Sequence, residues 1–243
     1  MRIKNLKDKI ILVTGASRGI GKAISLAVAQ SGAKIILVAR DEEKLKKVKE
    51  EINHLKGKAE AIKADLSKEN EVIHLFEQIK KRYQRLDVLI NNAGIATVGI
   101  TEDFSIDEFD KVMNINVRSV FLACQKAIKL MKEVNSGYII NISSVVGFKG
   151  YKGQCAYGIS KHGIMGLTKS LAAELQEQNI RVSAILPGAV NTQMVSDARP
   201  DLDASVLIDP KEIAHTVLYL LSLWDTNAAV DQIYIRRSKS KPF

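Results

Sequence analysis

The sequence is poor in several features that would mark other classes of protein. Its two cysteines, Cys124 and Cys155, lie in unrelated contexts without metal-ligand spacing, which predicts neither a disulfide framework nor a metal site. No apolar run approaches the ~18 residues that a membrane span needs, and residues 1–8 are too polar for the core of a signal peptide. We therefore expect a soluble protein of the reducing cytoplasm, without a metal and without a membrane partner.

Positive charge is abundant, but its distribution does not indicate nucleic-acid binding. The 36 lysines and arginines exceed the 27 acidic residues and give a net charge of +9. Much of the excess lies in residues 44–58 and 80–85, where lysines mix with glutamates or flank an amphipathic pattern, as on an exposed helix face. Aromatic residues make up 5% of the chain and leave few rings for stacking on bases. The most purely basic stretch, residues 236–243, is expected to form a mobile tail.

The order of segments predicts one α/β domain over residues 1–243, with a doubly wound, mostly or fully parallel sheet of seven strands. Apolar runs of strand length alternate with amphipathic segments of helix length, as in βαβ units. The expected strands are Ile10–Thr14, Lys34–Ala39, Lys58–Lys63, Val88–Asn91, Gly137–Ser143, Val182–Leu186 and Gln232–Ile235. The expected helices are Gly19–Ser31, Glu42–Leu55, Glu69–Tyr83, Ile106–Lys132, Tyr157–Gln178 and Pro210–Leu223, the last with Asp209 as its N-cap.

A glycine-rich turn joins the first expected strand to the first helix. Thr14-Gly15-Ala16-Ser17-Arg18-Gly19-Ile20-Gly21 has the spacing G-x-x-x-G-x-G. Glycines there permit a tight turn and a close approach of the backbone to a pyrophosphate, while the helix N-terminus supplies amide donors. The turn therefore predicts a dinucleotide site, although three glycines alone are equally compatible with tight packing of strand and helix.

Two further motifs follow in order. Asn91-Asn92-Ala93-Gly94 comes after the fourth expected strand, and Tyr157-Gly158-Ile159-Ser160-Lys161 opens a later helix. Together with the glycine turn, they resemble the motifs of the short-chain dehydrogenase/reductase family, and the resemblance extends from Lys9 to about Ile235. It implies a Rossmann-type domain that moves a hydride between a nicotinamide and a carbonyl or secondary alcohol.

The tyrosine and lysine are the expected source of the proton. Tyr157 and Lys161 are at i and i+4, on one face of a helix. A free phenol titrates near ~10, and an adjacent cation favours the phenolate, so Lys161 is expected to lower the pKa of Tyr157. The resemblance also implies that Ser144 binds the substrate oxygen, with Ser143 as the alternative. It implies that Asn116 supports a water relay to the lysine, with Asn114 as the alternative.

The resemblance assigns the remaining cofactor contacts to several loops. Asp65, after the third strand, matches the residue that binds the adenine amino group, although an aspartate there also suits a turn cap. The segment beginning at Pro187 matches the one that folds over the carboxamide. The expected cofactor-binding residues are Gly15, Ser17, Arg18, Gly19, Ile20, Gly21, Arg40, Asp65, Leu66, Asn92, Ala93, Gly94, Tyr157, Lys161, Pro187, Gly188, Val190 and Thr192.

Residues after the second strand predict NADP(H) as the cofactor. NAD-specific proteins hold the ribose hydroxyls with an acidic residue at the end of that strand, whereas this strand ends in Ala39 and Arg40. Arg40 and Arg18 are suited to pairing with a 2′-phosphate. Asp41, one residue later, is expected to point away or to cap the next helix.

The substrate is less well specified by the sequence. We expect a small ketone, a 3-oxoacyl compound or the corresponding alcohol, covered by a lid over residues 188–209 that includes Met194, Val195, Leu202, Val206 and Leu207. An acyl carrier protein is disfavoured, because the positions that match the carrier-binding arginines of related reductases are Asn135 and Gln178.

The oligomeric state and one competing function complete the expectations. A homodimer or homotetramer is expected through the helices Ile106–Lys132 and Tyr157–Gln178. The residues after Asp231 lack the two glycines common in the family, which disfavours the tetramer. The alternative function is a regulatory protein that binds NADP(H) without turnover, and the intact Ser144, Tyr157 and Lys161 argue against it.

Overall fold

The structure, a computed structural model, describes residues 6–242, so the expectations for residues 1–5 and for residue 243 lie outside it. Within these residues, seven strands form one fully parallel sheet in the order β3-β2-β1-β4-β5-β6-β7. The single doubly wound domain is confirmed. The strands are β1 (Ile10–Thr14), β2 (Lys34–Ala39), β3 (Lys58–Lys63), β4 (Val88–Asn91), β5 (Gly137–Ile142), β6 (Ile180–Pro187) and β7 (Gln232–Ile235).

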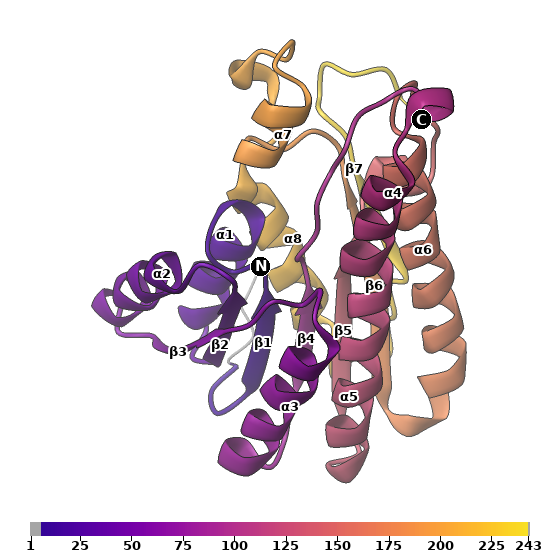
Figure 1. The fold of residues 1–243 in the computed structure, drawn as a ribbon. Helices are drawn as coiled ribbons and strands as arrows, with labels where there is room; N and C mark the ends of the chain where they lie inside the picture. The colour runs from indigo at the N-terminus through magenta and orange to yellow at the C-terminus, as the bar shows by residue number, and fades with distance from the viewer. Residues whose placement is uncertain (1–5, 243) are drawn as a thin grey trace.

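Helices cover both faces of the sheet (Figure 1). On one face, α1 (Gly19–Ala29), α2 (Glu42–His54) and α8 (Pro210–Ser222) bury side chains such as Ile24 and Val217 against the strands. On the other face, α3 (Glu69–Tyr83), α5 (Ser119–Glu133) and α6 (Cys155–Leu175) bury a second apolar layer. The shorter helices are η1 (Thr101–Asp103), α4 (Ile106–Met113), η3 (Val145–Gly147), η4 (Gln176–Gln178), α7 (Gln193–Ala198) and η5 (Ala204–Val206).

Some elements differ from the sequence-based expectation. The helix expected over Ile106–Lys132 contains a π-helical turn, η2 (Asn114–Arg118), between α4 and α5. The helix expected from Tyr157 begins two residues earlier and ends at Leu175. The expected N-cap of α8 is present as a capping box, in which Asp209 and Glu212 each accept a backbone N–H.

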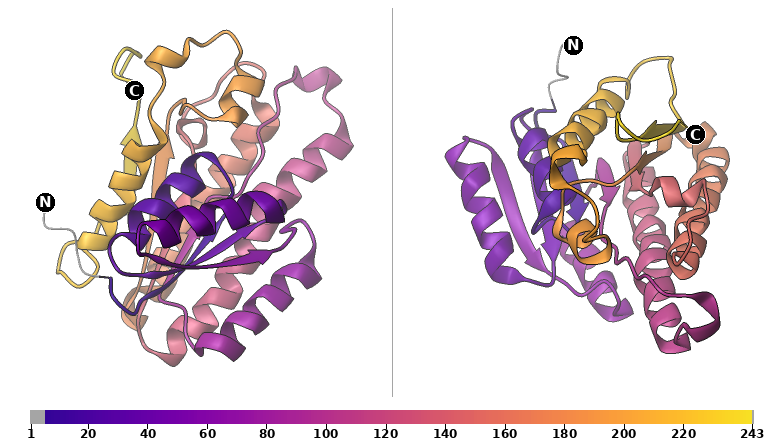
Figure 2. Two further views of the ribbon diagram at one scale, coloured as in Figure 1. Left: turned by 90° about the vertical axis from the view of Figure 1, so that its left-hand side faces the viewer. Right: turned by 90° about the horizontal axis from the view of Figure 1, so that it is seen from above.

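The order of strands reverses at β1, which pairs with β2 on one side and β4 on the other. Loops leaving the carboxyl ends of neighbouring strands diverge at such a point and leave room for a ligand. Helix α7 and the yellow segment after β7 both lie at this edge of the sheet (Figure 2).

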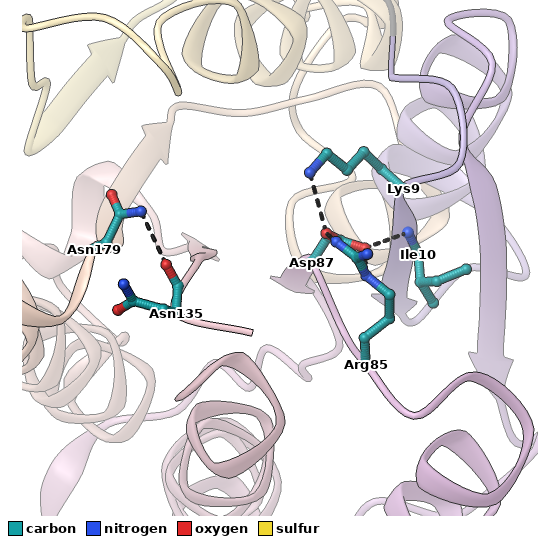
Figure 3. A network of polar contacts seen from close by, with 6 residues as sticks. All are labelled: Lys9, Ile10, Arg85, Asp87, Asn135 and Asn179. Carbon is teal, nitrogen blue, oxygen red and sulfur yellow. Dashed lines mark hydrogen bonds and ion pairs between the residues drawn. The ribbon is translucent and has the colours of Figure 1, made fainter. Parts of the chain in front are cut away.

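The opposite edge carries polar contacts that join the strands (Figure 3). The buried carboxylate of Asp87 accepts hydrogen bonds from the Ile10 N–H (2.8 Å) and from Arg85 Nε (3.0 Å), and it pairs with Lys9 (3.3 Å). None of the helices within residues 6–242 combines the length and the hydrophobicity that a membrane span requires.

Candidate active site

The glycine turn has a shape that side chains would prevent. Gly15 and Gly19 have φ values of +64° and +54°, in the left-handed region that favours glycine. A Cβ on Gly21 would lie 2.3 Å from the Gly15 carbonyl oxygen. Asn92 Nδ2 donates to the carbonyls of Thr14 (3.0 Å) and Gly15 (3.3 Å), which fastens the turn to the loop after β4. Gly21 and Asn92 therefore shape the turn.

A cleft of about 1050 Å³ lies beside this turn, and most of the expected cofactor residues line it. Gly21, Pro187, Gly188 and Val190 do not; Val190 is buried and pairs with Ile208 instead. The expected residues that line the cleft are Gly15, Ser17, Arg18, Gly19, Ile20, Arg40, Asp65, Leu66, Asn92, Ala93, Gly94, Tyr157, Lys161 and Thr192.

The sequence reading missed other residues of this cleft. Most are immediate neighbours of expected positions, so adjacency in the sequence is the signal that could have found them. They are Ala39, Asp41, Lys44, Ala64, Ser67, Ile95, Ile115, Ile142, Ser143, Asn191, Gln193, Met194 and Ser196.

The β2 end of the cleft carries three cations. Arg18 and Arg40 are exposed, and Lys44 pairs with Asp41 at 2.6 Å. Asp41 caps α2 by accepting the Lys44 N–H (3.0 Å), and the hydrogen bonds from Lys44 lower its pKa below the usual value. The carboxylate of Asp41 is therefore engaged with Lys44, and the expectation that it caps the next helix is confirmed.

Asp65, at the same end, combines two roles. Burial raises its pKa, but hydrogen bonds from Ser67 Oγ (2.7 Å) and Ser67 N (3.0 Å) outweigh burial, so the pKa lies below the usual value. The residue thus forms the turn cap that the sequence analysis considered, while it also lines the cleft. It lies within electrostatic reach of Arg40.

A second, smaller cavity of about 310 Å³ adjoins the cleft. Ser144, Tyr157 and Gly188 line it, and Tyr157 also lines the cleft. Of the expected lid residues, Met194, Val195 and Leu202 line this cavity. Val206 and Leu207 are not among the lining residues. The tyrosine ring is thus part of the wall between two spaces that each suit a ligand.

Tyr157 and Lys161 face one another across the first turns of α6. The Lys161 amine is 5.7 Å from the centre of the Tyr157 ring and donates to the Ile142 carbonyl (3.0 Å). Ser144 hydrogen-bonds the Tyr157 hydroxyl. Ser144 Oγ also accepts from the Val146 N–H (3.2 Å) and lies 3.4 Å from the Pro187 carbonyl oxygen. The serine hydroxyl and the phenol therefore lie together in the smaller cavity.

The protonation of this pair differs from the expectation. Burial raises the pKa of Tyr157 to about 12, and the Ser144 hydrogen bond lowers it only in part. Burial lowers the pKa of Lys161 to about 8. The prediction that the lysine depresses the tyrosine pKa is wrong for the protein alone, because removal from water disfavours the charged form of both groups.

The structure separates the two serine alternatives. Ser143 Oγ donates to the Lys161 carbonyl (3.2 Å) and lines the larger cleft. Ser144 lies with Tyr157 in the smaller cavity.

It also separates the two asparagines. Asn114 donates to the Ser67 carbonyl (3.0 Å). Asn116, in the π-helical turn, is buried and makes paired hydrogen bonds with the backbone of Ile95 (2.8 Å each) and a third with Ser160 (3.0 Å). A Cβ on Gly94 would lie 3.1 Å from Asn116 Oδ1 and 3.8 Å from Lys161 Nζ, which places both groups beside this glycine.

The basic segment expected to be a mobile tail is folded onto the smaller cavity. Arg236, Arg237, Ser240 and Lys241 all line it. The Gly188 N–H donates to the Ile235 carbonyl (2.7 Å), so the segment leaves β7 directly beside the loop after β6.

The positions that correspond to carrier-binding arginines lie at the other edge of the sheet. Asn135 and Gln178 precede the amino ends of β5 and β6, and Asn179 Nδ2 donates to the Asn135 carbonyl at 2.9 Å (Figure 3). Neither position is basic. Within residues 6–242, no group of three or more His, Cys, Asp or Glu side chains is arranged to hold a metal.

Sequence comparison places the chain in a family. The family model for short chain dehydrogenase matches residues 9–203, and the protein belongs to that family. A 3-oxoacyl-(acyl-carrier-protein) reductase of Thermotoga maritima is 35% identical over 226 residues, covering 89% of this chain and 92% of the relative. A levodione reductase of Leifsonia aquatica is 37% identical over 234 residues, covering 88% of each chain.

Solved structures agree with the family assignment. A metagenomic short-chain oxidoreductase in complex with NADP has a TM-score of 0.85 at 32% identity, covering 98% of this chain and 100% of that one. An actinorhodin polyketide ketoreductase variant with NADPH has a TM-score of 0.89 at 29% identity, covering 95% and 96%. The protein is thus an oxidoreductase of the short-chain dehydrogenase family by sequence and by fold.

Proposed function

We propose that the protein is an NADP(H)-dependent oxidoreductase that interconverts a carbonyl compound and a secondary alcohol, with Tyr157 as general acid and base. The observation that carries the proposal is the position of Tyr157, which lines both the cleft beside the glycine turn and the smaller cavity. A proton donor there reaches a substrate in one space while a cofactor occupies the other. The relatives that act on 3-oxoacyl compounds and on levodione support the same reaction type.

The residues of the larger cleft fit a nicotinamide dinucleotide. The glycine turn presents backbone without Cβ atoms at the N-terminus of α1, where amide donors and the helix dipole favour a pyrophosphate. Arg18 and Arg40 are suited to a 2′-phosphate, and the solved relatives with NADP and NADPH support this choice. When bound, the cofactor would supply the hydride, and the protein's own residues position the substrate and move the proton.

The protein positions the substrate oxygen and supplies a proton to it. The hydroxyls of Ser144 and Tyr157, which hydrogen-bond one another, form a pair of donors for that oxygen. A phenol with a pKa of about 12 is fully protonated at neutral pH, so Tyr157 is ready to donate in the reductive direction. The Lys161 amine, held by the Ile142 carbonyl, stabilises the phenolate that remains.

Asn116 is a positioning residue in this proposal. Its paired bonds with Ile95 hold the loop after β4, and its bond with Ser160 joins that loop to α6. The arrangement fixes Gly94 and the Lys161 amine relative to one another. We further propose a cytoplasmic homo-oligomer that acts on a small substrate without an acyl carrier protein.

The test is the Tyr157→Phe variant. We expect it to fold, and to lower kcat by at least ~10² on any ketone that the wild type reduces with NADPH, because the proton donor is lost. Tyr219→Phe is the control, since this exposed tyrosine on α8 lines neither cavity. Near-normal turnover by Tyr157→Phe would overturn the proposed mechanism.

A further inference from the structure

The smaller cavity is lined by an excess of positive charge. Among the residues that line it there is no aspartate or glutamate, and five side chains are cationic: Lys149, Arg199, Arg236, Arg237 and Lys241. They come from three separate parts of the chain, the loop after η3, the loop after α7 and the segment after β7. The carbonyl reduction proposed above does not use this charge.

Two of these cations, Arg199 and Arg236, are bound to other groups of the cavity wall. Arg199 donates to both carboxylate oxygens of Asp201, at 2.7 and 2.6 Å. Arg236 Nη1 donates to the backbone carbonyls of Arg237 (3.1 Å), Ser238 (3.1 Å) and Ser240 (2.6 Å). One guanidinium thus folds residues 236–240 into a turn, which the Ser240 N–H closes onto the Arg237 carbonyl (3.0 Å).

The other three cations have no ion pair within 4.0 Å among residues 6–242: Lys149, Arg237 and Lys241. Arg237 is only partly exposed, and the carboxylate within its electrostatic reach, Asp201, is already bound by Arg199. A partly buried guanidinium is costly to leave without an anionic partner. Its position in the cavity wall indicates that the partner is a ligand of the cavity.

The backbone of Arg236 and Arg237 lies close to the reaction centre. A Cβ on Gly188 would lie 3.6 Å from both Arg236 Cα and Arg237 N. The preceding carbonyl, of Pro187, lies 3.4 Å from Ser144 Oγ. The cavity volume of about 310 Å³ is at the lower end for small-molecule sites, so one compact molecule fills it.

The rest of the wall is mostly apolar. One polar exception is Thr97, whose buried Oγ1 has no hydrogen-bond partner within the described residues. The apolar lining residues include Val98, Val145, Val146, Val195 and Leu202. A ligand that matches this wall has a carbonyl at Ser144 and Tyr157, a short apolar spacer and an anionic end.

We propose that the substrate is a ketone carrying a carboxylate or phosphate group, or the corresponding alcohol, and that Arg237 and Lys241 bind this anionic group. The inference rests on the proposed function for the reacting end of the molecule. The 2′-phosphate of the cofactor is an unsuitable partner for these cations, because Arg18 and Arg40 line the other space. The two cations favour substrates that carry an anionic group, and the apolar wall limits the length of the substrate.

The experiment compares matched acids and esters with NADPH. The probes are methyl ketone carboxylic acids with one to four methylenes between ketone and carboxylate, each beside its methyl ester, and a ketone phosphate monoester beside its free alcohol. We expect kcat/KM for at least one anion to exceed that of its neutral partner by at least ~10-fold, as one charge-assisted hydrogen bond provides. A larger ratio for the phosphate pair identifies phosphate as the anion, and a larger ratio for a carboxylate pair identifies carboxylate.

Variants in the segment after β7 locate the contact. Arg237→Gln and Lys241→Gln should each lower kcat/KM for the preferred anion by at least ~10-fold, mainly through KM, and leave the neutral partner within ~2-fold. Lys239→Gln is the matched control, because Lys239 is in the same segment, is exposed and lines neither cavity. It should change neither value by more than ~2-fold.

Calorimetric titration of each acid into the protein makes the same comparison without turnover. A preference for the neutral partner in every pair, or equal losses for anion and neutral compound in Arg237→Gln, would overturn the inference. If the wild type reduced none of these ketones, but Arg237→Gln still weakened binding of the anion in calorimetry, the proposed function would be refuted and the inference about the anion site would stand.

Discussion

Replacement of Arg40 by alanine tests the choice of cofactor. Arg40 lines the cleft without an ion pair within 4.0 Å in the described part of the chain, and Arg18 lines the same space. Lys44 is the third cation, but Asp41 holds it at 2.6 Å and compensates its charge. Because both arginines are exposed, we assign each contact with a 2′-phosphate the lower value for a charge-assisted bond, about 1.5 kcal/mol, or ~10-fold in affinity.

The expected kinetics follow from this value. Arg40→Ala should lower kcat/KM for NADPH by ~10-fold and leave NADH within ~2-fold, and the Arg18→Ala, Arg40→Ala double variant should lose ~10² for NADPH. Initial rates measured from cofactor absorbance give kcat/KM for NADPH and for NADH. When they are measured at low and at high salt, the preference for NADPH should shrink as salt screens exposed charges. Arg82→Ala, on α3 and outside both cavities, is the control. A wild type that prefers NADH, or an equal loss for both cofactors, would refute the reasoning.

Three further predictions concern the lid and stability. Hydrogen exchange in residues 188–209 should slow when cofactor and substrate are bound, and equal protection with and without ligands would exclude a lid. Lys161→Met should raise the free energy of unfolding by up to about 3 kcal/mol below pH 8, since burial lowers the lysine pKa to about 8. Between pH 8 and 10.5 the unfolded wild-type chain binds more protons than the folded one, so wild-type stability rises with pH over that range. The stability gain of Lys161→Met over the wild type should therefore shrink there. Equal gains in urea titrations at pH 6.5 and 9.5 would contradict this. Asp87→Ala should cost about 2–4 kcal/mol in urea unfolding, because it leaves the buried Ile10 N–H without an acceptor, and a cost below ~1 kcal/mol would show that water replaces the carboxylate.

Local patterns were sufficient to predict the strands, and the family resemblance predicted about half of the residues that line the cleft. Strands such as Lys34–Ala39 are short, apolar and flanked by turn residues, and their boundaries agree with the structure. The π-helical turn at Asn114–Arg118 was not predicted, because one wider turn hardly changes the spacing of apolar residues. Periodicity therefore indicates that a helix exists, but not how its backbone hydrogen bonds are arranged.

The sequence predicted which side chains lie together around Tyr157, but it did not predict the direction of their pKa shifts. The spacing of Tyr157 and Lys161 places them on one helix face, but it carries no information about burial, which determines the direction of both pKa shifts. The turn built on Arg236 was also missed. Its three acceptors are backbone carbonyls, which no side-chain pattern reveals, and composition alone predicts only a solvated basic stretch.

The shared wall of the two spaces has a thermodynamic consequence. Because Tyr157 and Met194 line both, a ligand that moves either side chain from one space changes the shape that the other space offers. Occupancy of the two spaces is then linked, and linkage is reciprocal: the factor by which the first ligand alters affinity for the second equals the factor in the opposite direction. For such a ligand, the movement of one shared side chain couples the two binding equilibria without any movement of the sheet.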